Sequence, residues 1–91
     1  MSGDALARAN RVRSMLFVPG TKPEIFDKAT TSGADFVTVD LEDAVAPPLK
    51  ADARPEAIKF LSGEGDVLRA VRINPLSTAH GLADMLAILE A

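Results

Sequence analysis

The feature that most constrains the fold is residues 35–45, DFVTVDLEDAV, where an apolar, β-branched run ends in three carboxylates. Such a run is typical of a buried strand. Side chains alternate along a strand, so one face is expected to be aliphatic and the other increasingly acidic. The aliphatic set is Val37, Val39 and Leu41, and the other set is Thr38, Asp40 and Glu42. Parallel α/β folds bind ligands at the carboxyl ends of their strands, so the sequence predicts an active-site strand.

Two further stretches, residues 15–18 and 67–73, have the length and apolar character of strands. Each is closed by a turn signal, Pro19-Gly20 after the first and Asn74-Pro75 after the second. Helical patterns separate the three stretches and follow the last one. The order βαβαβα favours parallel strands joined by right-handed crossovers.

The first helix is expected to begin with a capping box. Thr21 would be the N-cap, with Pro23 in the first turn and Glu24 three positions after the threonine. Gly33 suits the residue that follows the end of this helix. The sequence therefore predicts a strand, a turn, a helix and a glycine stop.

The second helix is expected to have Asp52 as its N-cap. This places Pro55 in the first turn, where its missing N–H costs no helical bond. The loop before it contains consecutive prolines. Thr78 or Ser77 can cap the last helix, whose apolar positions follow helical spacing. These positions are Leu82, Met85, Leu86 and Leu89.

Composition narrows the class of protein. The net charge of −3 argues against general nucleic-acid binding. The absence of cysteine removes disulfides and thiolate metal sites and fits a reducing compartment. No apolar run approaches the roughly 20 residues that span a bilayer, and residues 1–10 lack the apolar core of a secretion signal. We expect a cytoplasmic enzyme or domain with no nucleic-acid or membrane partner.

The organisation of the chain suggests an incomplete domain. Residues 1–12 are expected to form a tail and residues 13–91 the folded part. The sequence ends inside the last predicted helix without a stop signal, and a three-stranded parallel sheet would expose both edges. A small flavodoxin-like domain is an alternative, but no phosphate-binding glycine loop follows the first strand. We expect the opening segment of a larger protein.

Three phrases in this order resemble the amino-terminal third of the citrate lyase β-subunit-like proteins, within the HpcH/HpaI aldolase family. They are RSMLFVPG at residues 13–20, GAD with DLEDAV at residues 33–45, and VRINPL at residues 71–76. Lys50 and Arg54, spaced after the acidic strand, also look like that family. DLEDAV together with VRIN resembles the CoA-ester lyase branch rather than the free-acid aldolase branch.

The resemblance implies a (β/α)8 TIM barrel of about 250 residues, of which this chain would supply about the first three βα units. It also implies a Mg²⁺-dependent carbon–carbon lyase that cleaves a citryl-, malyl- or citramalyl-type CoA thioester into an acyl-CoA and a 2-oxo acid. The resemblance further implies a homo-oligomer, a trimer or hexamer, and metal ligands that come from later strands. No metal ligand is therefore assigned in this chain, which is expected to be inactive alone. The alternative is a noncatalytic partner or regulatory module built from the same barrel segment.

Arg72 is the strongest candidate for a catalytic and substrate-binding residue. It is expected at the carboxyl end of the third strand, where its planar fork can bind a 2-oxo-acid carboxylate. The resemblance implies the same role, together with stabilisation of an enolate. The structural alternative is an internal salt bridge with Glu42 or Asp40, because an arginine is costly to bury without a carboxylate.

Glu42 and Asp43 are expected to support catalysis by holding waters of a Mg²⁺ ion rather than by binding the ion directly. The alternative for Glu42 is an ion pair with Arg72 or Lys50, and that for Asp43 is a turn or cap residue. For Asp40, an ion pair in the barrel core and support of the active site are equally expected.

Basic residues near the same rim are weaker candidates for the active site. Lys22 is expected to bind substrate by meeting a CoA phosphate, although a solvated lysine at a helix start is the simpler interpretation. Lys50 and Arg54 are expected to pair with the acidic strand end or to contact the thioester. His80 is expected at the surface, and Arg13 at the opposite rim, where stability is the usual role.

Overall fold

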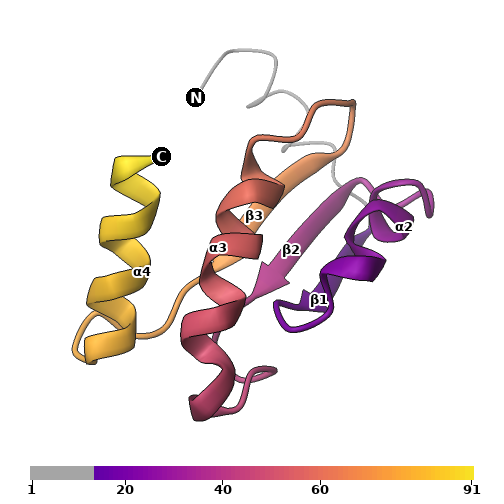
Figure 1. Ribbon diagram of the computed structural model, residues 1–91. Helices are drawn as coiled ribbons and strands as arrows, with labels where there is room; N and C mark the ends of the chain where they lie inside the picture. Colours follow the sequence, from indigo (N-terminus) through magenta and orange to yellow (C-terminus); the bar gives the residue numbers. More distant parts are fainter. Residues whose placement is uncertain (1–13) are drawn as a thin grey trace.

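The computed structural model describes residues 14–91 (Figure 1). The predicted tail at residues 1–12 and Arg13 lie outside the described residues. In chain order the elements are β1 (Met15–Pro19), the 3₁₀ helix η1 (Pro23–Ile25), α2 (Phe26–Thr30), β2 (Phe36–Asp40), the 3₁₀ helix η2 (Pro47–Leu49), α3 (Lys50–Leu61), β3 (Leu68–Arg72) and α4 (Ala79–Glu90).

The three strands form one parallel sheet in the order β1-β2-β3. β2 is the central strand, and its last residue, Asp40, lies opposite Pro19 of β1 and Arg72 of β3. All three strands therefore end at the same edge, which we call the carboxyl edge. The predicted alternation of parallel strands and helices is confirmed.

Helices α2 and α3 cover one face of the sheet (Figure 1). Val37, Val39 and Leu41 are completely buried beneath them, as the aliphatic face of the predicted strand requires. The rings of Phe26 in α2 and Phe60 in α3 meet edge to face, with centroids 5.5 Å apart. This geometry suits aromatic pairs and fastens the two helices to each other.

The predicted N-cap at Thr21 is wrong. The first helix begins as the 3₁₀ turn η1, whose N-cap is Lys22 and makes no side-chain capping bond. The reason is the short turn after β1, in which the Lys22 amide donates to the Pro19 carbonyl and places Pro23 at the helix start. Gly33 has the expected left-handed backbone, with φ of +95°, but it follows a helix that already ends at Thr30.

The predicted N-cap at Asp52 is also wrong, because the helix starts earlier. η2 winds the two prolines of the expected loop into a 3₁₀ turn that runs directly into α3 at Lys50. Pro55 therefore lies inside α3 rather than in its first turn. The prediction for Thr78 is confirmed, since its hydroxyl accepts a hydrogen bond from the Gly81 amide at 3.0 Å.

The last helix, α4, packs on α3, and much of its apolar side is exposed. Leu82, Leu86 and Leu89 are each more than half exposed, whereas the two buried residues of α4 are Gly81 and Asp84. In residues 14–91, no helix combines the length and the apolar character needed to cross a membrane.

Candidate active site

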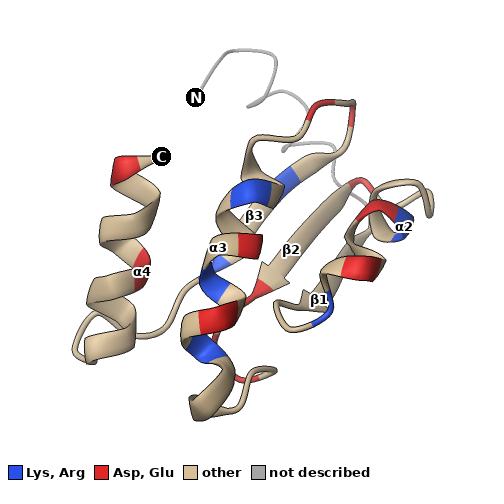
Figure 2. Ribbon diagram, viewed as in Figure 1, with Lys and Arg blue, Asp and Glu red and all other residues tan. Residues whose placement is uncertain are grey.

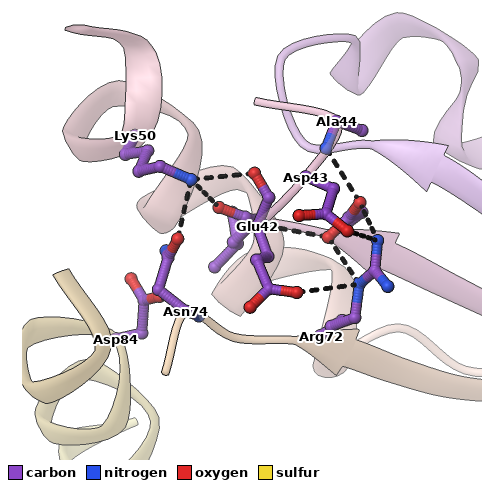
Figure 3. A network of polar contacts seen from close by, with 9 residues as sticks. Glu42, Asp43, Ala44, Lys50, Arg72, Asn74 and Asp84 are labelled. Carbon is purple, nitrogen blue, oxygen red and sulfur yellow. Dashed lines mark hydrogen bonds and ion pairs between the residues drawn. The ribbon is translucent and has the colours of Figure 1, made fainter. Parts of the chain in front are cut away.

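The carboxyl edge holds a bidentate ion pair between Asp40 and Arg72 (Figure 3). Nε of Arg72 donates to Oδ1 of Asp40 at 2.9 Å, and Nη2 donates to Oδ2 at 2.6 Å. The Asp40 side chain is 3% exposed, but that of Arg72 is 41% exposed. The structural pairing foreseen for Arg72 is thus present, and it leaves a large part of the guanidinium open to solvent.

The Asp40 carboxylate also organises the chain that follows it. Oδ1 accepts from the amide of Glu42 at 2.8 Å, and Oδ2 accepts from the amide of Ala44 at 3.0 Å. These bonds shape residues 41–44, which we call the acidic turn. One buried carboxylate therefore fixes both the acidic turn and Arg72, which brings Asp40 into the site.

The pKa values of this pair move apart. Burial alone would raise the pKa of Asp40, but the hydrogen bonds from Arg72 and then from the amides of Glu42 and Ala44 outweigh it and hold that pKa below its ordinary value. The hydrogen bond to Asp40 raises the pKa of Arg72 further above its already high value. Both groups stay charged at neutral pH.

Glu42 and Asp43 complete the cluster around Arg72. An oxygen of Glu42 lies 3.9 Å from Nε, and an oxygen of Asp43 lies 3.7 Å from Nη2 (Figure 3). Asp43 is largely exposed, with 79% of its side chain accessible to solvent, so its contact with Arg72 is loose. The structure thus brings Arg72, Glu42 and Asp43 together at one edge.

Lys50 does not pair with a carboxylate at the strand end, which corrects one prediction. Its buried ammonium donates to the carbonyls of Leu41 at 2.9 Å and Glu42 at 2.8 Å, and to Oδ1 of Asn74 at 2.6 Å. From the start of α3, the Lys50 side chain therefore reaches the backbone of the acidic turn rather than its carboxylates.

Arg54 does not pair with the acidic strand end either. Nε of Arg54 donates to Asp84 of α4 at 2.7 Å, and its Nη2 lies 3.4 Å from Nδ1 of His80. Arg54 is one turn beyond Lys50 and faces α4 instead of the sheet edge. His80 is only half-buried and belongs to this contact between helices.

Sequence reasoning missed Asn74 and Asp84. Asp84 is 1% exposed, and its Oδ2 accepts from both the amide and Nδ2 of Asn74, at 3.0 and 2.7 Å. Burial raises the pKa of Asp84, but the bonds from Asn74 and Arg54 outweigh this and lower it overall. The available signal was Asp84 itself, because Asp84 and Glu90 are the only acidic residues of α4, whose two acidic positions are red in Figure 2.

Lys22 lies in the loop after β1 and is exposed. Because β1 ends at the carboxyl edge, this loop is on the same rim as Arg72. Binding of a CoA phosphate by Lys22 stays a prediction.

The described residues do not form a magnesium site by themselves. Within residues 14–91, no group of three or more His, Asp or Glu side chains is arranged to hold a metal ion. Asp40 already accepts four hydrogen bonds, which leaves Glu42 and Asp43 as the oxygen donors on the rim. Such carboxylates can hold waters of a Mg²⁺ ion, because the ion usually keeps several of them in proteins.

The sequence model of a known family, described as HpcH/HpaI aldolase/citrate lyase, matches residues 13–91. The chain belongs to the HpcH/HpaI aldolase/citrate lyase family. The resemblance predicted from the three sequence phrases is therefore confirmed.

Members of the HpcH/HpaI family with assigned functions are similar to this chain. An L-malyl-CoA/β-methylmalyl-CoA lyase of Cereibacter sphaeroides is 43% identical over 86 residues, which cover 92% of this chain and 26% of the lyase. A (3S)-malyl-CoA thioesterase of the same species is 40% identical over 86 residues, which cover 92% of this chain and 30% of the thioesterase. The chain thus spans between a quarter and a third of the length of these relatives.

Solved structures of the same family agree with the fold. CitE of Mycobacterium tuberculosis in complex with magnesium and acetate superposes with a TM-score of 0.74 at 36% identity, over 91% of this chain and 33% of CitE. CitE in complex with magnesium, acetoacetate and coenzyme A gives 0.74 and 36%, over 90% of this chain and 29% of CitE. The predicted fold class, the opening part of a TIM-barrel-type α/β fold, is confirmed.

Proposed function

We propose that this chain forms part of a Mg²⁺-dependent carbon–carbon lyase that acts on a citryl-, malyl- or citramalyl-type CoA thioester and releases an acyl-CoA and a 2-oxo acid. The observation that carries the proposal is the half-exposed guanidinium of Arg72, fixed by Asp40 at the carboxyl edge. Ligands of parallel α/β folds bind at this edge. The similarity to malyl-CoA lyase and to CitE supports the choice of substrate class.

In the proposed reaction Arg72 is the catalytic and substrate-binding residue. Asp40 accepts from Nε and from one N–H of Nη2, so the second N–H of Nη2 and the N–H groups of Nη1 remain for a substrate carboxylate. As the carbon–carbon bond breaks, the substrate hydroxyl gives up its proton and becomes the carbonyl of the 2-oxo acid, and the electron pair of the bond remains on the thioester side as an enolate. Protonation of the enolate carbon then gives the acyl-CoA. A fixed positive charge beside the developing oxyanion lowers the barrier, because no dipole has to reorient during the reaction.

The remaining predicted site residues have supporting roles in this proposal. Glu42 and Asp43 flank Arg72 and contribute hydrogen-bond acceptors at the rim. Lys22, on the neighbouring loop, supplies a positive charge for a CoA phosphate. Magnesium is part of the proposal because the similar protein CitE was crystallised with it. Glu42 and Asp43 would contact the ion through its waters. A homo-oligomer, a trimer or hexamer, located in the cytoplasm is part of the same proposal.

A thioesterase is the second candidate, because one similar protein is a (3S)-malyl-CoA thioesterase. Arg72 can stabilise an oxyanion in either reaction, so its geometry does not separate the two. The products do: a lyase gives an acyl-CoA and a 2-oxo acid, whereas a thioesterase gives free CoA and the hydroxy acid. A noncatalytic partner or regulatory module would give neither set.

The test uses the full-length protein that contains this chain and a panel of hydroxyacyl-CoA thioesters, with and without Mg²⁺. Release of an acyl-CoA that depends on Mg²⁺ and falls by about 10²-fold or more in Arg72→Ala supports the lyase. Lys28→Ala, on the exposed side of α2, is the control and should retain turnover. Absence of cleavage for every thioester, or near-normal turnover of Arg72→Ala, would reject the proposal.

A further inference from the structure

Lys50 is a buried charged residue to which the proposed reaction assigns no role. An ammonium carries three N–H donors and no acceptor. All three donors are used, by the carbonyls of Leu41 and Glu42 and by Oδ1 of Asn74. Burying a charge is costly unless its hydrogen bonds are satisfied. An apolar residue would fill this position in α3 without that requirement, so the buried ammonium calls for a role beyond packing.

The two carbonyls that Lys50 binds belong to the two peptide groups on either side of Glu42. The amide of the first of these groups, Glu42 N–H, is held by Oδ1 of Asp40 at 2.8 Å. The peptide between Leu41 and Glu42 is thus fixed at both ends, by Asp40 through its N–H and by Lys50 through its C=O. With the next carbonyl also bound, the backbone dihedral angles of Glu42 are set, and so is the starting direction of its side chain. The peptide group after Asp43 is held by Oδ2 of Asp40 through the Ala44 amide, so the peptide groups on both sides of Asp43 are fixed as well.

Lys50 is itself held in place by a chain of buried polar groups. Asn74 turns its amide oxygen to Lys50 (Figure 3) because its Nδ2 donates to Oδ2 of Asp84. Asp84 in turn accepts from Arg54 through Oδ1. The negative charge of Asp84 therefore faces Lys50 through one amide group. This arrangement polarises the amide in the direction that strengthens its bond to the ammonium.

We propose that Lys50 is a positioning residue for the acidic turn, which aims Glu42 and Asp43 at the guanidinium of Arg72, and that Asn74 and Asp84 hold Lys50 in the required orientation. The proposal of a catalytic consequence rests on the lyase function proposed above. Lys50 does not touch Arg72, which remains bound to Asp40 without it. Loss of Lys50 should therefore lower kcat and change KM little.

The test compares four variants of the full-length protein. Lys50→Met removes the ammonium but retains much of the length of the side chain. Lys50→Gln is polar but cannot make all three hydrogen bonds, and it keeps the test open if Lys50→Met folds poorly. Lys59→Met changes an exposed lysine of the same helix. Phe60→Leu lowers stability from the core at the far end of α3, so it shows what destabilisation alone does to turnover.

Two measurements are made on each variant, well below its unfolding temperature. Hydrogen–deuterium exchange is followed in peptides that cover residues 41–46, where the amides of Glu42, Ala44 and Val45 are hydrogen-bonded. Turnover is followed as acyl-CoA release at saturating substrate. We expect both Lys50 variants to exchange these amides about tenfold faster or more and to lose about tenfold or more in kcat, as is usual for residues that orient a site. Lys59→Met and Phe60→Leu should stay within about twofold of the unmodified protein in both measurements.

The outcomes separate this proposal from the proposed function. Unchanged exchange in both Lys50 variants would overturn the positioning role, as would faster exchange without any loss of kcat. An equal loss of kcat in Phe60→Leu would also overturn it, because the effect would then be one of stability. If the unmodified protein cleaves no thioester but the Lys50 variants still exchange faster, the lyase function fails while the fixing of the acidic turn by Lys50 stands.

Discussion

Replacement of Asp40 by asparagine is the sharpest test of how the site is built. The change is isosteric, so the sheet and the core need not move. Each oxygen of Asp40 now accepts two hydrogen bonds, one from the backbone of the acidic turn and one from Arg72. An asparagine amide has one oxygen and one NH₂ group, so in either orientation the NH₂ group faces two donors.

The expected loss of stability in Asp40→Asn follows from the hydrogen-bond donors that lose their acceptor. In one orientation the amide of Ala44 is left without a partner, and in the other that of Glu42 is. An unsatisfied backbone donor of this kind costs about 1–3 kcal/mol, and water can replace the bond to the half-exposed Arg72. We expect the free energy of unfolding to fall by about 1–3 kcal/mol. Turnover should fall by about 100-fold, because a guanidinium displaced by about 1 Å no longer matches the substrate.

The assay combines urea unfolding with acyl-CoA release, both on the full-length protein. Asp27→Asn, an exposed aspartate in α2, is the matched control and should change neither measurement. Unchanged stability together with turnover within about twofold of the unmodified protein would refute the view that Asp40 organises the site. A loss of stability with full turnover would leave Asp40 a structural role only.

Three further predictions concern single residues. Arg72→Lys should lower turnover by about 10²-fold or more, because an ammonium cannot replace the bidentate bonds to Asp40; acyl-CoA release measures this, and normal turnover would contradict it. Gly81→Ala should lower the unfolding temperature clearly, because its Cβ would overlap the Pro75 carbonyl oxygen, and backbone atoms cannot give way as a flexible side chain can; an unchanged thermal melt would contradict it. Asp84 has a lowered pKa in the folded state, so it stabilises the protein above the ordinary value of 3.8, and this contribution is lost as the pH falls through the lowered pKa. Asp84→Asn should flatten that acid dependence in urea unfolding, and an identical pH profile would show that the charge of Asp84 is immaterial.

The strands were predictable because their signals are local. The β-branched run that became β2 and the turn residues after each strand lie within a few positions of one another, and the alternation of elements then indicates a parallel sheet. The meeting of Asp40 and Arg72 also followed, because two parallel strands that end together bring their last residues side by side.

The helix starts were less predictable. Thr21 and Asp52 have the side chains of N-caps, yet nearby prolines begin 3₁₀ turns that place the caps at Lys22 and Leu49 instead. A propensity for capping is worth only about 1 kcal/mol, so the backbone restriction imposed by proline can override it.

The partners of Lys50 and Arg54 could not be derived from the sequence. Both lie close to the acidic turn along the chain, which favoured pairing with its carboxylates. The actual partner of Lys50 in the third βα unit is Asn74, 24 positions away, and that of Arg54 is Asp84, 30 positions away. The packing of α4 against α3 brings Asp84 to Arg54, and the packing of α3 against β3 places Asn74, in the loop after β3, beside Lys50. No local pattern encodes either contact.

The spatial order of the strands is the same as their order in the chain. Each strand is therefore paired with the one synthesised just before it, and the pairing residues are separated by only 21 positions between β1 and β2 and 32 between β2 and β3. Closing such loops carries a modest entropic cost. No pairing within this sheet needs residues beyond β3, so the Asp40–Arg72 pair requires nothing that is synthesised after Arg72.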